Sequence, residues 1–138
     1  MGLIGIDYEF VDYSSARFDA SGTSFSDVND AIRTKYTTAS NLRIGTEWRY
    51  NNISFRGGYA VYGTPFNAGQ NAPGADQSKT SITGGIGLRD GNYFLDLGYA
   101  YSQSTEYFQQ YSLMNQDVPG SKNTIQTNNF VMTFGVKF

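Results

Sequence analysis

The chain contains neither cysteine nor histidine. Without cysteine there are no disulfides, thiolate nucleophiles or thiolate-bound metals. Without histidine, the commonest metal ligand and the usual general base are missing. A Ser-His-Asp triad or a zinc site therefore cannot be assembled. We predict no catalytic residues, no metal site and no cofactor, and we expect that the protein is not an enzyme.

Long apolar runs and an excess of one charge sign are also missing. No segment approaches the ~18 apolar residues of a membrane helix, which excludes a helical membrane protein. The 10 basic and 12 acidic residues give a net charge of -2, which is too balanced to suggest a nucleic-acid partner. The length of 138 residues fits one domain, 1–138.

Aromatic residues and glycine are abundant, with 11 Tyr, 10 Phe and 16 Gly, although the mean hydropathy is negative. Six segments alternate apolar and polar residues, as strands with two different faces do. They are 3–13, 41–50, 53–63, 80–90, 93–103 and 127–138. One face of all six contains no charged residue, and no segment is left over to cover it. We expect that lipid or detergent covers it.

The opposite face holds nine charged residues: Asp7, Glu9, Arg43, Glu47, Arg49, Arg56, Arg89, Asp96 and Lys137. They could line a lumen that guides a solute, or form ion pairs that fill it. We favour ion pairs, since a selective pore usually has an excess of one sign. Asp7 and Glu9 could form a carboxylate pair for acid-base chemistry, but pairing with the basic residues is favoured.

The connections alternate between short and long. Asn51-Asn52 and Asp90-Gly91 are signals for tight hairpins, whereas 14–40, 64–79 and 104–126 are long polar loops. The first hairpin should pair Glu47 with Arg56, and the second should pair Leu88 with Tyr93. This asymmetry is typical of an antiparallel transmembrane β-barrel of meander topology, with short periplasmic turns and long external loops. Six strands are too few for a natural barrel, so we predict a partial barrel or one completed by oligomerisation.

Aromatic residues of the charge-free face gather toward the strand ends, which predicts two girdles at the headgroup levels. Good strand propensity alone could also explain them, but their placement on the charge-free face favours girdles. The girdle residues are Tyr8, Phe10, Trp48, Tyr50, Phe55, Tyr59, Tyr93, Tyr99, Tyr101 and Phe130.

The final segment, 128–138, reads NNFVMTFGVKF and resembles the C-terminal strand that outer-membrane barrels present to their assembly machinery, with Phe134, Val136 and Phe138 as the signal. The segments 41–50 (NLRIGTEWRY), 53–60 (ISFRGGYA), 64–66 (TPF) and 5–14 (GIDYEFVDYS) resemble the late strands of FadL-like transporters for long-chain fatty acids and aromatic hydrocarbons. The Bacteroidetes variants, often labelled haemin receptors, are the most similar.

The resemblance covers essentially the whole chain but only the last part of a family barrel. It implies a 14-stranded barrel with an N-terminal hatch, a lateral opening for hydrophobic ligands, and a bacterial outer-membrane location. Met1 runs directly into the first strand without a leader, so we expect a fragment of a longer protein. An isolated fragment is expected to be a homo-oligomer, because open sheet edges are not tolerated in lipid. The alternative is a small autonomous barrel with a structural or adhesive role through its long loops.

Two loop features have weaker signals. Asp27, Asn29 and Asp30 could supply oxygen ligands to calcium, although the spacing of an EF-hand is missing. The aromatic segment 106–113 either extends its strand above the membrane toward a ligand or only stiffens the loop.

Overall fold

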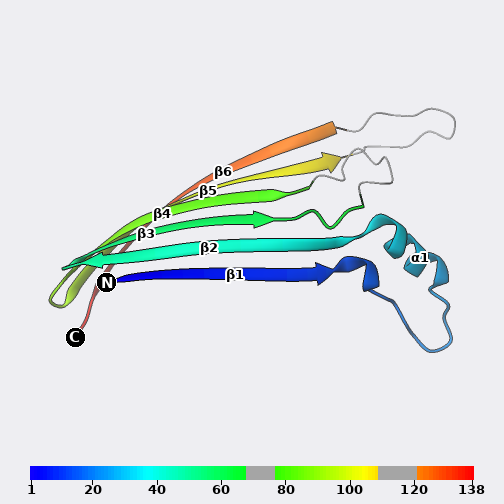
Figure 1. Cartoon of the computed structure of the whole chain (residues 1–138), viewed down its shortest axis with the longest axis horizontal. Helices are drawn as coiled ribbons and strands as arrows, with labels where there is room; N and C mark the ends of the chain where they lie inside the picture. The colour runs from blue at the N-terminus through cyan, green and yellow to red at the C-terminus, as the bar shows by residue number, and fades with distance from the viewer. Residues whose placement is uncertain (68–76, 109–120) are drawn as a thin grey trace.

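Six strands form one antiparallel sheet in the computed structural model, which describes residues 1–67, 77–108 and 121–138. Each strand pairs with the next along the chain, in the order β1-β2-β3-β4-β5-β6 (Figure 1). The strands are β1 (Gly2–Asp12), β2 (Thr38–Tyr50), β3 (Ile53–Tyr62), β4 (Lys79–Asp90), β5 (Tyr93–Phe108) and β6 (Ser121–Val136). The predicted six-stranded antiparallel meander is therefore confirmed.

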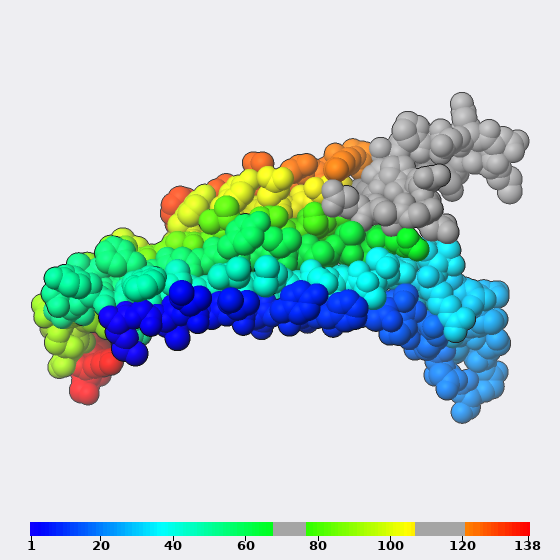
Figure 2. Space-filling model, in the orientation of Figure 1, coloured from blue at the N-terminus to red at the C-terminus, as the bar shows by residue number. Residues whose placement is uncertain are grey.

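The sheet is a single bowed layer (Figures 1 and 2). In the described part of the chain only Ala39, Ser54 and Gly87 are buried, the first two at 4% and 5% exposure. A sheet of this size normally buries one face against another layer, which is how a domain obtains its core. This sheet obtains no core from the described residues.

The first tight hairpin has the predicted register. Tyr50 pairs with Ile53, and Glu47 pairs with Arg56. Asn51 is the first loop residue and has a φ of 50°, a left-handed conformation that asparagine tolerates better than most residues. The register predicted from these turn residues is therefore confirmed.

The register predicted for the second hairpin is wrong by two residues. Leu88 pairs with Leu95 rather than with Tyr93, which pairs instead with Asp90. The loop is Gly91-Asn92 because Gly91 supplies the left-handed conformation, φ 55°, at the first loop position. A shift of two residues keeps every side chain on its predicted face, so the assignment of faces is unaffected.

The predicted loop 14–40 is more ordered than expected. It contains a short 3₁₀ helix, η1 (Tyr13–Ser15), and an α-helix, α1 (Ser26–Lys35), both at the end of the sheet opposite the tight turns (Figure 1). The Asp12 side chain caps η1 by accepting a hydrogen bond from the Ser14 backbone N–H. After α1, Tyr36 bridges to Phe66 in the loop that follows β3, and their rings lie 5.2 Å apart.

The last two strands are longer than predicted. β5 runs to Phe108, and β6 begins at Ser121, six residues before the predicted start at 127. This extension is mainly polar and lacks apolar alternation, so it gave no strand signal. Pairing with β5 continues along it to Phe108 opposite Ser121. Part of the predicted aromatic segment, 109–113, lies outside the described residues.

The sheet is open. Among the described strands, β1 pairs only with β2 and β6 pairs only with β5. Both chain ends lie at the tight-turn end (Figure 1). Within the described residues, no helix is both long and apolar enough to cross a membrane.

Candidate functional site

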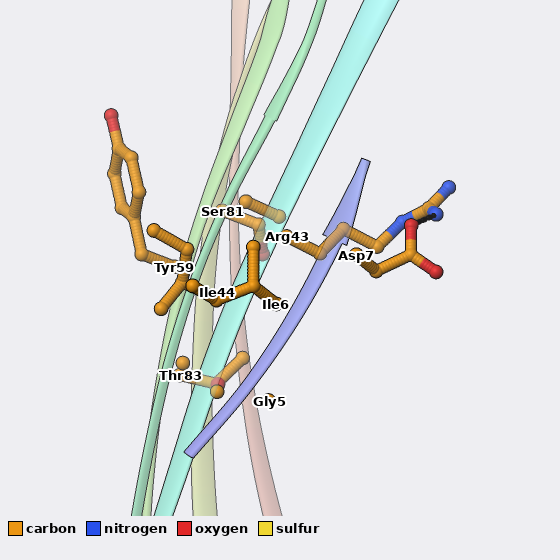
Figure 3. Close-up of a pocket in the computed structure, with 11 residues that line it drawn as sticks. Gly5, Ile6, Asp7, Arg43, Ile44, Tyr59, Ser81 and Thr83 are labelled. Carbon is orange, nitrogen blue, oxygen red and sulfur yellow. Dashed lines mark hydrogen bonds and ion pairs between the residues drawn. The ribbon is translucent and has the colours of Figure 1, made fainter. Parts of the chain in front are cut away.

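The sheet has two chemically different faces. Close to β1, β2 and β3, Ile6, Ile44 and Tyr59 point to one side while Asp7 and Arg43 point to the other (Figure 3). We call the first side the apolar face and the second the polar face. The registers of all five strand pairs place the nine charged residues predicted for one side together on the polar face.

Arg43 is the centre of the first ion-pair cluster on the polar face. Its Nη1 lies 2.8 Å from Asp7 Oδ1, and its Nη2 lies 2.9 Å from Glu9 Oε2. The Tyr62 ring is 5.2 Å from the Arg43 guanidinium carbon, and Asn41 donates a further hydrogen bond to Glu9. Asp7 and Glu9 therefore share one arginine, which ties edge strand β1 to β2 and fits pairing better than acid-base catalysis.

A second cluster crosses four strands. Glu47 on β2 accepts hydrogen bonds from Arg49 and from Arg56 on β3, the latter at 2.9 Å. Arg56 also reaches Asp96 on β5, at 2.8 Å, across the intervening strand β4. Exposed pairs of this kind contribute about 0.2 to 1 kcal/mol each, so their main effect is to fix the geometry of the face.

Glycine makes the long reach of Arg56 possible. Gly87 of β4 pairs with Ser54 on one side and with Asp96 on the other. A Cβ atom at Gly87 would overlap the Asp96 carboxylate and the Ser54 hydroxyl. Sequence analysis did not predict this role, because only the register reveals which strand the guanidinium has to cross.

A strip of small residues separates the two clusters. Paired residues run from Gly5 through Gly45 and Gly58 to Thr83. A hollow of about 450 Å³ lies along this strip, and Thr83 also lines a second hollow of about 330 Å³ that extends to β6. The polar face therefore has one open hollow beside each of the two ion-pair clusters.

The two remaining predicted charges lie near the tight turns. Arg89 and Lys137 line a smaller hollow of about 200 Å³ together with Phe94. The Phe94 ring covers Gly135 of β6, where a Cβ atom would overlap it. Within the described residues neither Arg89 nor Lys137 forms an ion pair, so the predicted ladder of ion pairs includes seven of the nine charges.

The apolar face is uncovered across the six strands. Ile6 is 70% exposed, Trp48 56% and Met132 74%. Ring contacts on this face join β5 to β6: Tyr99 and Phe130 lie 4.8 Å apart, and Tyr93 and Phe134 lie 6.4 Å apart. An apolar surface of this extent marks a site of interaction with an apolar partner or solvent.

Aromatic residues near the loop end follow a straight oblique line. Following directly opposite residues from strand to strand, Tyr8 on β1 is level with Val61 on β3 and with Gln103 on β5. Tyr59 lies two residues nearer the tight turns than Val61, and β3 is two strands from β1. Tyr99 lies four residues nearer the tight turns than Gln103, and β5 is four strands from β1. The line therefore shifts by one residue per strand.

A parallel line follows the tight-turn end. Following directly opposite residues, Tyr50 on β2 is level with Phe134 on β6, which is four strands away. Phe138 lies four residues nearer the tight turns than Phe134, so this line also shifts by one residue per strand. Five other predicted girdle residues lie within two residues of one line or the other: Phe10, Trp48, Tyr93, Tyr101 and Phe130. Phe55 and Phe134 lie between the lines.

The loop residues considered for calcium serve another purpose. Asp27, Asn29 and Asp30 belong to α1, where Asn29 exchanges two hydrogen bonds with the Phe18 backbone and Asp30 lies 3.9 Å from Arg33. In the described ranges there is no group of three or more acidic residues that could hold a metal ion.

Comparison with protein-family models, curated proteins and solved structures gives no match for this chain. The resemblance to FadL-like transporters therefore stays a prediction.

Proposed function

We propose that this chain forms part of the wall of a bacterial outer-membrane β-barrel that transports hydrophobic solutes such as long-chain fatty acids. The observation that carries the proposal is a single-layer sheet whose uncovered apolar face opposes a face of ion pairs. Lipid solvates the apolar face of such a sheet, while water in a lumen solvates the other. In the outer membrane, the assembly machinery would receive the C-terminal strand with Phe134, Val136 and Phe138.

The two oblique aromatic lines support a membrane orientation. A shift of one residue, about 3.4 Å, for each strand spacing of about 4.8 Å corresponds to a strand tilt of roughly 35°. Strands of closed barrels are tilted by about 35 to 45°. At this tilt the two lines become level girdles roughly 20 Å apart, close to the apolar band of about 25 Å in outer-membrane barrels.

The polar face supports a lumen wall that is open rather than filled. Its charges are largely neutralised by neighbours in the sheet, and hollows of about 450 and 330 Å³ lie along the strip of small residues and next to it. A neutral, glycine-lined surface does not select ions of one sign. It leaves room for a bulky solute, which fits the solute class that the family resemblance implies.

The proposal is tested by expressing the gene from which the chain comes in a bacterium that lacks its own long-chain fatty-acid importer. Growth on a long-chain fatty acid as the only carbon source is expected, with growth on acetate as the control. A matched variant, Met132→Arg, puts a charge on the apolar face. It is expected to abolish growth on the fatty acid but not growth on acetate. Protein that is present in the outer membrane without supporting growth would refute transport.

The ordered loop-end module favours a second candidate, an adhesive or structural barrel. The segment that follows α1 is tied to the loop after β3 through the Tyr36–Phe66 bridge and through the hydrogen bond from the Thr37 N–H to the Pro65 carbonyl. A rigid surface of this kind suits recognition of a partner outside the cell. Membrane insertion without fatty-acid uptake is the result that would favour this candidate.

A further inference from the structure

The hydrogen-bonding phase of β1 determines which residues face its free edge. Met1 and Arg49 exchange both backbone hydrogen bonds, so every second residue from Met1 onward bonds to β2. The intervening residues, from Gly2 to Phe10, direct their backbone N–H and C=O groups away from β2. Their side chains all belong to the apolar face.

In β6, as in β1, the residues of the polar face bond to the neighbouring strand. The Lys137 N–H donates to the Asn92 carbonyl at 2.8 Å, which places Gly135, Thr133 and Val131 in bonded pairs with β5. The free backbone groups of β6 then belong to Val136, Met132 and their apolar-face neighbours. When two edge strands pair, the residues with free backbone groups lie opposite each other. The two faces of the sheet therefore continue across the joint only if these residues belong to the same face in both strands. In β1 and β6 they all belong to the apolar face.

We propose that the sheet closes with a second copy of this chain, β1 of each copy pairing antiparallel with β6 of the other to form a twelve-stranded barrel. β1 runs away from the tight-turn end and β6 runs toward it, so the pairing keeps all tight turns at one rim (Figure 1). Neither edge strand contains proline, and β1 contains no lysine. Edges that stay free in natural sheets usually carry such protection.

The aromatic lines select the register of this joint. The offset must be even, since an odd offset would put apolar side chains on the polar face. Continuing the shift of one residue per strand places Phe10 opposite the partner's Phe130. It also places Tyr8 opposite the partner's Met132, and Ile4 opposite the partner's Val136.

The polar face of the joint is also compatible with this register. Gly5 falls opposite the partner's Gly135. A Cβ atom at Gly5 would meet nothing within 4 Å, so the space beside it is open. In this register the Phe94 ring that covers Gly135 in each copy would lie next to Gly5 of the neighbouring copy.

Engineered cysteines test the joint without background, because the native chain has none. Val11 and the partner's Asn129 form a non-hydrogen-bonded pair in the proposed register, where the Cα atoms of a strand pair lie about 4.5 Å apart and a disulfide can form. A Val11→Cys chain and an Asn129→Cys chain are folded together in detergent and oxidised. The matched control replaces the second chain with Thr127→Cys, two residues out of register on the same face.

A disulfide-linked pair of chains is expected on non-reducing gels, about tenfold more abundant for Asn129→Cys than for Thr127→Cys. The unmodified, cysteine-free chain should have the mass of two copies by light scattering and should change its gel mobility on boiling. A monomer, a larger ring, or a dimer that forms no Val11–Asn129 disulfide because its sheets pack face to face would each overturn the proposal. Preferential linkage at Thr127 would overturn the register.

The inference rests on the barrel-wall part of the proposed function, not on the solute. The two therefore fail separately. Membrane insertion with no edge disulfide refutes only the joint, whereas an edge-linked dimer that supports no fatty-acid uptake refutes only transport.

Discussion

At the scale of single residues, the polar face depends on positions that have no side chain. Arg56 bonds to Asp96 across β4, where Gly87 leaves space for the Asp96 carboxylate. Gly84, three residues earlier on the apolar face, has nothing within 4 Å of where a Cβ atom would be. Two glycines of one strand thus have different structural roles.

The variant Gly87→Ala is expected to destabilise the folded protein by about 1 to 3 kcal/mol, since the added methyl overlaps the Asp96 carboxylate and separates it from Arg56. Gly84→Ala is the matched control and should change stability by no more than about 1 kcal/mol. The measurement is the midpoint of urea unfolding in detergent, followed by the fluorescence of the one tryptophan. Equal effects of the two substitutions would contradict the role given to Gly87.

At the scale of strands, the two faces predict opposite tolerance to charge. Met132 and Thr133 are neighbours on β6, both exposed, one on each face. Met132→Arg puts a cation where the proposal puts lipid and should cost about 2 to 4 kcal/mol near the bilayer midplane. Thr133→Arg points into the proposed lumen and should cost about 0.5 kcal/mol or less.

Reversible unfolding in lipid vesicles measures both variants. In water each exposed substitution would have a similarly small effect, so a difference that appears only in lipid is the informative result. Equal tolerance of the two arginines in vesicles would show that the apolar face does not contact lipid.

The strands were predictable wherever their sequence alternates sharply, and not elsewhere. Ile4, Ile6 and Tyr8 alternate with polar residues, so β1 was predicted to within one residue at each end. The start of β6 was missed because Thr124 and Gln126 provide no contrast between faces. For the second hairpin, the predicted faces were correct but the predicted register was wrong. Alternation repeats every two residues, so it cannot detect a shift of two residues.

The candidate site was predictable in its composition but not in its connections. Charges on one face follow from alternation, which is a local property. The contact between Arg56 and Asp96, 40 residues apart, depends on the registers of β3, β4 and β5 together. The helix α1 was missed for a related reason, since its sequence has only two large apolar residues, Val28 and Ile32, to indicate a face.

At the scale of the whole molecule, the part of the chain that the structure describes lacks the buried core that stabilises a protein of this length in water. A domain of about 150 residues usually buries about two-thirds of its surface on folding. Here the apolar side chains remain exposed, including Phe130 at 82% and Leu3 at 68%. Under the proposed function, surrounding lipid and the proposed edge joint would supply the stabilisation that a core supplies elsewhere.

Trp48 reports on that surrounding directly, because it is the one tryptophan and lies on the apolar face near the tight turns. Its ring covers Gly2 of β1 yet remains 56% exposed. We expect vesicle lipids brominated on their acyl chains to quench its fluorescence, most strongly when the bromines are close to the headgroups, since girdle rings lie at that depth.

The matched control moves the reporter to the other face. In the double variant Trp48→Phe/Phe94→Trp the tryptophan occupies the polar face, beside Arg89 and Lys137. It should be quenched by a water-soluble ion such as iodide and little affected by brominated lipids. If Trp48 were quenched by iodide and not by lipid, the apolar face would be covered by protein, and a sandwich of two sheets in water would replace the barrel wall as the explanation of the uncovered face.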